Sequence, residues 1–560
     1  MPRASAPPAT CRRALLPALL LAVVPAGGLF AQGGVPGSAV IILGQEPTTP
    51  IPTLTGLGAS LDVSNQLFLR LARLAPGLRT AGDSGFAPEL AQRWSRRDSV
   101  TLVFDLDPRA RWHDGRPVVA NDVVTTLDRA RDPASGGRYA SLLTEIAGVR
   151  AEGTRRVVVS FRRRYAEQLY DAVFHVPPLP AHLVAAIPAE SLATSRFARE
   201  PVGNGPYRWV RSAPGQLVEL ESVRGHFLGT PGIRRLVFRV VPDADARLNL
   251  LLSGDGDALE AVSPPVANLE RIRAAGHLRE VPVAGGNLGY VLFNQVDPAD
   301  SARSRPHPIL GDVRVRQALV RALDRERMVR SVFGPYAAVP EGPTSQLWWI
   351  RSLAPPAWPT DTAAARRLLA EAGWRDSDGD GVLDRGGVPF ALRFNVPAPS
   401  ATRRLIALQM QEQLRPLGVR LDVQLLEGAV WQERRNRGDF DLDFASAVQD
   451  PSPSGIVNSW SCANAGRPFA NVARYCNPAV DSLVSAARFG AADPAPPWRD
   501  VLLLIQADAP AIFLYAPATA FAVSSRYRDA VLRADSPWGD IRRWSVDPAR
   551  ALPRDRVTGR

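Results

Sequence analysis

Strands and helices alternate along this chain in two successive series, and this order constrains the fold more than any other feature of the sequence. The first series has a continuous strand of apolar residues and Arg at 233–241, a helix at 243–252 that opens on acidic residues, and a short strand at 254–260. Acidic residues are favoured at helix starts because they complement the helix dipole. Strand, helix and strand in this order predict an α/β core.

The second series is marked by helix caps. It begins with an apolar strand at 288–294. Asp312, Asp324 and Asp361 then each precede a helical pattern, where a carboxylate accepts hydrogen bonds from the first free N–H groups of a helix. A half-buried strand with alternating apolar residues is expected at 419–425. The second series therefore predicts a second α/β lobe.

Two connections between the lobes are expected. The chain should cross from the first lobe to the second near 280–290 and return near 500–512, so that the buried strand at 511–515 belongs to the first lobe. Two crossings form a hinge with a cleft beside it, and such clefts close on ligands. In the first lobe, Leu, Val and Phe at helical spacing predict one helix over 61–74.

The first 31 residues have the pattern of an export signal. Arg3, Arg12 and Arg13 precede an apolar run at 14–24, and Ala31 offers a small residue for cleavage. The run is much shorter than the roughly 20 residues that span a bilayer. We expect a signal peptide and a periplasmic protein; the arginine pair leaves the general and the twin-arginine export routes open.

The positive charge of the chain does not form a basic patch in the sequence. All 67 basic residues are Arg, and the formal net charge is +12, or +9 once the three arginines of the leader are subtracted. The arginines are spread over every segment, without a basic run interleaved with aromatic residues. A nucleic-acid partner is therefore not expected.

Short motifs between Ala87 and Asp481 occur in a fixed order. Together they resemble the family 5 extracytoplasmic solute-binding proteins of ABC importers, the family of peptide-, oligopeptide- and nickel-binding proteins. The motifs are Ala87-Pro-Glu-Leu-Ala91, Trp112-His-Asp-Gly115, Ala120-Asn-Asp-Val-Val124, Asp312-Val-Arg-Val-Arg-Gln-Ala-Leu319, Leu368-Leu-Ala-Glu-Ala-Gly373, Gly438-Asp-Phe-Asp-Leu442 and Tyr475-Cys-Asn-Pro-Ala-Val-Asp481.

The resemblance implies a two-lobed periplasmic binding protein fold of the α/β class (cluster C, type II), with an extra side subdomain and an interlobe cleft. The expected divisions are a signal peptide at 1–31, lobe I at 32–75, a side subdomain of lobe I at 76–195, lobe I again at 196–282, lobe II at 283–505, and the return to lobe I with the tail at 506–560.

The resemblance also implies a function. A protein of this kind captures a peptide or peptide-like solute and delivers it to the membrane permease subunits of an ABC importer. We expect a monomer without cofactor, metal or catalytic residues. The alternatives are a non-peptide solute, such as a glycoside, a nickel chelate or haem, and a secreted hydrolase with the same fold. No nucleophile, base and acid can be assembled from the sequence, which disfavours the hydrolase.

One position departs from the pattern of the peptide-binding relatives. In them an acid in the segment after the Gly-Asp-Phe-Asp-Leu motif holds the amino group of the ligand, because a buried ammonium must be paired. Counted back from Pro451, that position is Ala447 here, and the nearest acid is Asp450. We expect Asp450 to face the cleft and to supply charge to a cationic ligand; the other reading is that it caps its own turn.

Four further side chains are candidate ligand contacts. Aromatic rings give contact area in such clefts at little cost in conformational entropy, and core packing is the competing interpretation for each ring. The candidates are Tyr290, Asn294, Trp431 and Trp460.

The cysteines predict one disulfide. Cys11 precedes the apolar run of the leader, on the wrong side for a lipoprotein cysteine, so lipid anchoring is not expected. Cys462 and Cys476 remain in the exported chain, where an oxidising compartment favours a disulfide worth about 3 kcal/mol. Two free buried thiols are the alternative.

Two other motifs are weak. Asp376-Ser-Asp-Gly-Asp-Gly381 resembles the first half of a calcium loop, but Gly387 stands where the bidentate Glu is required, so a surface turn is favoured. Gly82-Asp-Ser-Gly85 resembles the nucleophile loop of a serine protease without a matching histidine order, and is read as a turn.

Overall fold

The computed structural model of the protein describes residues 37–54, 58–132, 139, 142–260, 262, 267–468 and 470–556. The expected leader, 1–31, and Cys11 lie outside these residues. In the part of the chain that is described, no helix has the length and apolar character needed to cross a membrane.

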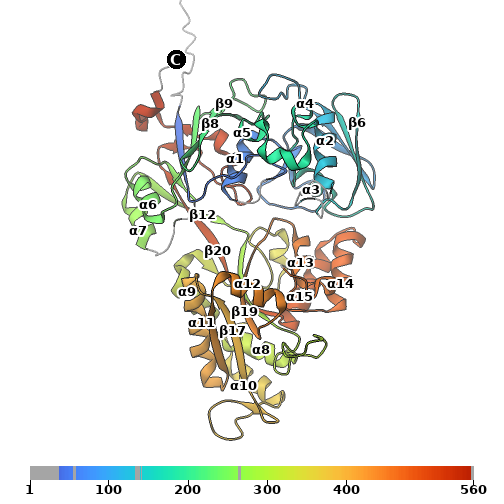
Figure 1. Ribbon diagram of the computed structural model, residues 1–560, viewed down its shortest axis with the longest axis vertical. Helices are drawn as coiled ribbons and strands as arrows, with labels where there is room; N and C mark the ends of the chain where they lie inside the picture. Colours follow the sequence, from blue (N-terminus) through green and yellow to red (C-terminus); the bar gives the residue numbers. More distant parts are fainter. Residues whose placement is uncertain are drawn as a thin grey trace, which may run out of the picture. The chain divides into compact units, whose positions relative to one another are not determined.

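A single 12-stranded sheet runs through the molecule (Figure 1). Two of its strands, β12 (Leu278–Ala284) and β14 (Ala337–Ala338), pair only with β20. The other strands follow one another in the order β18 (Arg420–Leu426), β17 (Ala391–Pro397), β19 (Leu442–Val448), β13 (Asn287–Phe293), β20 (Ala511–Ser524), β11 (Ala258–Leu259), β1 (Ser38–Leu43), β10 (Arg235–Val240), β9 (Leu217–Ser222) and β8 (Tyr207–Ala213).

The sheet is divided between two lobes, as the sequence predicts. Lobe I holds β1 and β8 to β12, with α1 (Ala59–Leu67), α6 (Ala244–Leu252) and α7 (Ala267–Ala274). Lobe II holds β13 and β17 to β19, and its helices are α8 (Val313–Ala322), α9 (Arg325–Phe333), α10 (Thr362–Glu371), α11 (Ala401–Leu414), α12 (Gly428–Arg437), α13 (Ile456–Trp460), α14 (Pro478–Ser485) and α15 (Ala495–Asp508). Each face of the lobe II sheet carries its own apolar cluster.

The chain returns to lobe I later than predicted. Residues 511–515 do not belong to lobe I, because they pair with β13 of lobe II. The same strand continues as 518–524, which pair with β12 of lobe I. The second crossing therefore lies within β20, next to the first crossing between β12 and β13.

A separate antiparallel sheet forms the side subdomain. Its order is β4-β5-β7-β6, with β4 (Ala91–Asp98), β5 (Thr101–Leu106), β7 (Arg156–Phe161) and β6 (Ile146–Glu152). Among the described residues, four α-helices accompany it, namely α2 (Ala120–Arg131), α3 (Gln168–Val173), α4 (Ala181–Val184) and α5 (Arg196–Arg199). Its apolar residues share one cluster with those of lobe I. The sheet lies inside 76–195, while the exact divisions remain a prediction.

Local signals were reliable at the helix starts. Asp312, Asp324 and Asp361 each accept a backbone N–H hydrogen bond at the start of α8, α9 and α10. The strand predicted at 233–241 forms β10, and the helix predicted at 243–252 forms α6. Such caps act within one turn of the chain and do not depend on tertiary context.

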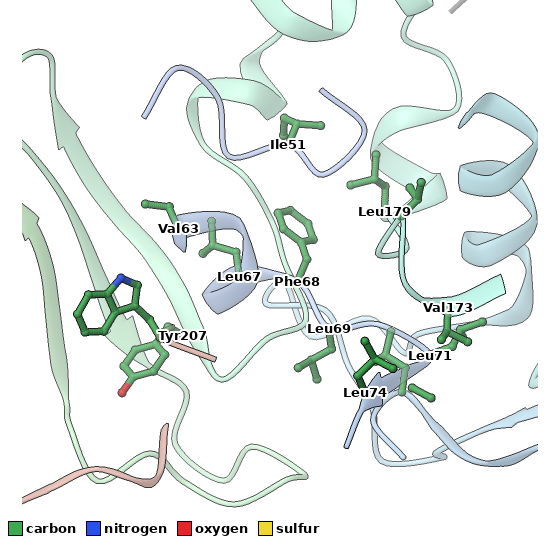
Figure 2. Packing of buried hydrophobic residues seen from close by; sticks show 14 of the residues in the cluster. Ile51, Val63, Leu67, Phe68, Leu69, Leu71, Leu74, Val173, Leu179 and Tyr207 are labelled. Atoms are coloured by element: carbon green, nitrogen blue, oxygen red, sulfur yellow. The ribbon is translucent and has the colours of Figure 1, made fainter. Parts of the chain in front are cut away.

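The helix predicted over 61–74 is shorter than predicted. Helix α1 ends at Leu67, and Ala72–Leu74 forms β2, which pairs with β3 (Phe86–Pro88). The side chain of Asn204 accepts a hydrogen bond from Leu69 N at 2.8 Å, which holds the backbone extended between the two elements. Figure 2 shows this extended segment directing apolar side chains into the core of lobe I. Tertiary pairing here overrides the helical spacing.

The end of the chain is fixed to lobe I by a buried ion network. Arg526 donates to both carboxylate oxygens of Asp257 at 2.8 and 3.0 Å, and to Asp555 at 2.6 Å. It also donates to the carbonyl of Ser38, the first residue of β1. All of these residues are buried, so each charge relies on the others in place of water.

Candidate functional site

The carboxyl ends of three parallel strands in lobe II define the candidate site. Strands β17 and β18 are parallel along their length, while β17 and β19 pair only at 394–395 and 442–443 and then separate. The connection from β17 to β18 and the connection from β18 to β19 run in opposite directions across the sheet. Ligands of open α/β sheets bind at such points, outside the carboxyl ends of the strands.

A buried carboxylate lies beneath this edge. Asp443 on β19 is fully buried and accepts a hydrogen bond from Arg435 of α12 at 2.7 Å. Burial raises the pKa of Asp443 to about 6, although Arg435, the indole of Trp431 and Arg403 act in the opposite direction. The ion pair thus fixes α12 against the sheet.

Trp431 is the predicted ligand contact that retains exposed surface at this edge. It belongs to the first part of α12 and is half-buried. The guanidinium carbons of Arg435 and Arg403 lie 5.3 and 5.8 Å from its ring centroid. A ring near two cations presents a flat apolar surface next to positive charge.

Three other predicted contacts lie inside lobe II. Tyr290 and Trp460 are 5% and 2% exposed, and their ring centroids are 6.1 Å apart. Both belong to one apolar cluster, which also contains Phe513. Asn294 is 1% exposed and donates to the carbonyls of Gly438 and Phe440, so it holds the turn before β19. A ligand role for these residues stays a prediction.

The segment after β19 carries the position of the missing acid. Ala447 is opposite Leu288 on β13, and its side chain is a methyl group where the resemblance implies a carboxylate. Asp450 retains exposed surface and accepts a hydrogen bond from Ser452 N at 2.8 Å, as a turn cap does. Desolvation raises the pKa of Asp450, while His175 and Tyr170 of the side subdomain act to lower it. The carboxylate of Asp450 therefore lies next to the side subdomain.

The same segment is held to the side subdomain through one buried acid. Glu167, at the start of α3, accepts hydrogen bonds from the hydroxyls of Thr80, Ser452 and Ser454. The Ser452 hydroxyl lies 2.8 and 2.9 Å from the two carboxylate oxygens. Burial raises the pKa of Glu167. One carboxylate thus joins a hydroxyl of the side subdomain to two hydroxyls of the segment after β19.

We expect Glu167→Ala to lower the free energy of unfolding by about 2–3 kcal/mol, because buried hydroxyls lose their acceptor. Urea unfolding of the purified protein measures this loss. Glu190→Ala is the matched control, since Glu190 is an exposed acid of the same subdomain. Equal unfolding midpoints for the two variants would show that the Glu167 contact contributes nothing.

The remaining predicted features lie outside the strand edge. Cys462 and Cys476 are joined by a disulfide with a Cα–Cα distance of 4.4 Å, in the loop after α13. Asp376, Asp378 and Asp380 lie close together on an exposed turn, where Asp376 accepts hydrogen bonds from the backbone of Gly379 and Gly381. These backbone bonds are those of a surface turn.

Sequence reasoning missed two charged residues of the site. Arg403 of α11 and Glu167 of the side subdomain carry no motif, and Glu167 is 285 positions from Ser452. The one signal for Arg403 is its place just after Ser400, which caps α11 by accepting from Arg403 N. A helix cap that follows a parallel strand indicates that the helix begins at the carboxyl ends of the strands, where ligands of α/β sheets bind.

The chain was compared with known protein families and with curated relatives. The family model described as bacterial extracellular solute-binding proteins, family 5, middle, matches residues 85–467. The oligopeptide-binding protein AppA of Bacillus subtilis is 26% identical over 470 residues, which cover 82% of each protein. Protein XP55 of Streptomyces lividans is 28% identical over 518 residues, covering 87% of this chain and 85% of that protein.

Solved structures show the same fold. AppA of Bacillus subtilis in complex with a nonapeptide has a TM-score of 0.71 at 24% identity, and the match covers 91% of this chain and 99% of that one. NikZ of Campylobacter jejuni in complex with Ni(L-His) has a TM-score of 0.72 at 21% identity, with the same coverage. The two-lobed α/β fold and the long family match agree with the order of motifs in the sequence. The chain therefore belongs to the family 5 bacterial extracellular solute-binding proteins.

Proposed function

We propose that this protein captures a peptide or peptide-like solute between its two lobes and presents it to the permease subunits of an ABC importer. The observation that carries this proposal is the family match over residues 85–467, together with relatives that are named as peptide-binding proteins. The two crossings in β20 and between β12 and β13 lie side by side, which suits a hinge. We propose a monomer that binds and does not catalyse.

The proposed location is outside the cytoplasm. The basic start and the apolar run of the first 31 residues support export through a cleaved leader. Cys11 precedes that run, which supports a protein without a lipid anchor. The Cys462–Cys476 disulfide suits an oxidising compartment.

A non-peptide solute is the second candidate, and Ala447 favours it. A peptide with a free amino terminus needs a negative partner for its ammonium group, and that position holds a methyl group here. Asp450, whose carboxylate already caps a turn, is the proposed substitute. Proteins with this fold have been solved with Ni(L-His) and with agropinic acid, so the fold alone does not fix the ligand.

Mass spectrometry of the solute released from protein purified from the periplasm tests the proposal. We expect masses of short peptides or peptide-like compounds, and binding of the same compounds to stripped protein in calorimetric titration. Turnover of a peptide or ester panel that depends on a cleft residue would instead support the hydrolase. A released metal chelate or sugar would replace the peptide proposal by the second candidate.

A further inference from the structure

Arg403 makes no ion pair with any carboxylate in the described part of the chain, although it is half-buried. It is the third residue of α11 (Ala401–Leu414), the helix that follows β17 in the chain. Its guanidinium donates to the hydroxyl of Ser446 on β19. The side chain therefore spans the gap where β17 and β19 separate, with a neutral partner on the far side.

Aromatic rings surround the guanidinium. Its central carbon lies 5.8 Å from the ring centroid of Trp431 and 5.8 Å from that of Phe444. Arg403 also opposes the rise that burial causes in the pKa of Tyr515. Phe444 is buried, whereas Trp431 retains exposed surface. A small molecule that reaches Trp431 can therefore reach the guanidinium as well.

The charges at this edge do not balance. Asp443, whose pKa Arg403 helps to lower, is already paired with Arg435 at 2.7 Å. Two arginines and one aspartate leave a surplus of one positive charge, because +2 − 1 = +1. Partly desolvated cations are stabilised by an anion, and a planar guanidinium matches a carboxylate in geometry.

The surplus charge lies on a surface open to solutes. Ser446, the partner of Arg403, is exposed, and Val448 at the end of β19 is 62% exposed. Ala447, between them, adds no negative charge that would repel an anion. The strand end thus combines an unpaired cation, a flat indole and exposed apolar side chains.

We propose that Arg403 binds a carboxylate or a similar anionic group of the solute, with Trp431 as the apolar surface beside it. This inference rests on the proposed function of solute capture and names the class of solute: one with an anionic group next to an apolar or planar part. It differs from recognition of a cationic amino terminus, for which the acid at position 447 is missing.

Two matched pairs of probes test this proposal in calorimetric or NMR titrations. The first is a pentapeptide, acetylated at its amino terminus, with a free carboxylate or a carboxamide at its end. The second is indole-3-acetate and indole-3-acetamide, which have the same shape and differ in charge. In each pair that binds, we expect the carboxylate to bind at least about tenfold more tightly, the size of a hydrogen bond between charged groups.

Arg403→Gln should abolish the preference for the carboxylate. Arg404→Gln is the matched control, because Arg404 is the next residue of the same helix and is exposed. The melting temperature of both variants is measured alongside, so that a loss of folding is not read as a loss of recognition. A folded Arg403→Gln protein that retains the preference would overturn the proposal, as would equal affinities within both pairs for the unmodified protein.

The two pairs of probes also distinguish a failure of the Arg403 proposal from a failure of the proposed peptide capture. Peptides that bind without regard to the carboxylate would support peptide capture and contradict the role of Arg403. Preference for indole-3-acetate, lost in Arg403→Gln, without binding of either peptide would support Arg403 and contradict peptide capture. Absence of binding to all four probes would contradict both.

Discussion

Arg526→Leu is expected to lower the free energy of unfolding by about 3–5 kcal/mol, the cost of leaving buried charges without their partner. The change removes the guanidinium between Asp257 and Asp555 and the donor to the Ser38 carbonyl. Arg554 remains near Asp257 at 2.8 Å, but Asp555 loses its ion-pair partner. Since Ser38 begins β1, the first strand and the chain end should loosen together. Urea unfolding followed by circular dichroism measures the loss.

Arg196→Leu is the control for the same change at the surface. Arg196 pairs with Glu200, and both side chains are largely exposed, at 87% and 64%. Exposed pairs of this kind contribute at most about 1 kcal/mol, because water solvates each partner when the other is removed. If the two variants unfolded at the same urea concentration, the buried network would contribute no more to the free energy of unfolding than the exposed ion pair does.

The sequence predicted those parts of the fold that depend on neighbouring residues. The three Asp caps of α8, α9 and α10 work within one helical turn, so their pattern could be read directly. The full length of β20 could not be read, because Pro517 interrupts its apolar run. Proline has no N–H for the ladder and usually marks a strand end or an edge. Here Pro517 lies between the residues of β20 that pair with β13 and those that pair with β12.

The site was predictable only in part, for a related reason. Tyr290 and Trp460 are aromatic residues of the right segments, yet they pack against each other in the core of lobe II. A single aromatic residue in a sequence does not indicate whether its ring meets a ligand or a neighbouring side chain. Arg403 and Glu167 acquire their roles from partners on other elements, Ser446 and Ser452. Such pairings depend on the order of strands in the sheet, and sequence patterns of neighbouring residues do not reveal that order.

Acid should destabilise the protein through His113, which belongs to the Trp112-His-Asp-Gly115 motif. Its Nδ1 accepts a hydrogen bond from Gly203 N at 3.2 Å, and its Nε2 lies 3.0 Å from the carbonyl oxygen of Gly205. The ring therefore has to be neutral, with its proton on Nε2. Burial lowers the pKa of His113 to about 4, an effect that the Gly205 carbonyl only partly offsets.

The sign of the pH effect follows from this depressed pKa. The imidazole gains its proton near pH 6.5 in the unfolded chain and near pH 4 in the folded protein, so the unfolded state binds more protons between these values. The stabilising contribution is complete above about pH 6.5 and is lost as the pH falls toward 4. A shift of this size corresponds to about 3 kcal/mol. Protonation would also place a hydrogen on Nδ1, against the N–H of Gly203.

His113→Gln is expected to reduce the loss of stability between pH 7 and pH 4 by about 3 kcal/mol relative to the unmodified protein, because glutamine takes up no proton in this range. Urea unfolding at a series of pH values gives the two curves. His277→Gln provides the control, since His277 is exposed and lies outside this contact. The carboxylates are the same in all three proteins, so their titration cancels in the difference. If the free energy of unfolding changed with pH in the same way for His113→Gln and His277→Gln, a charged imidazole next to Gly203 and Gly205 would cost no stability.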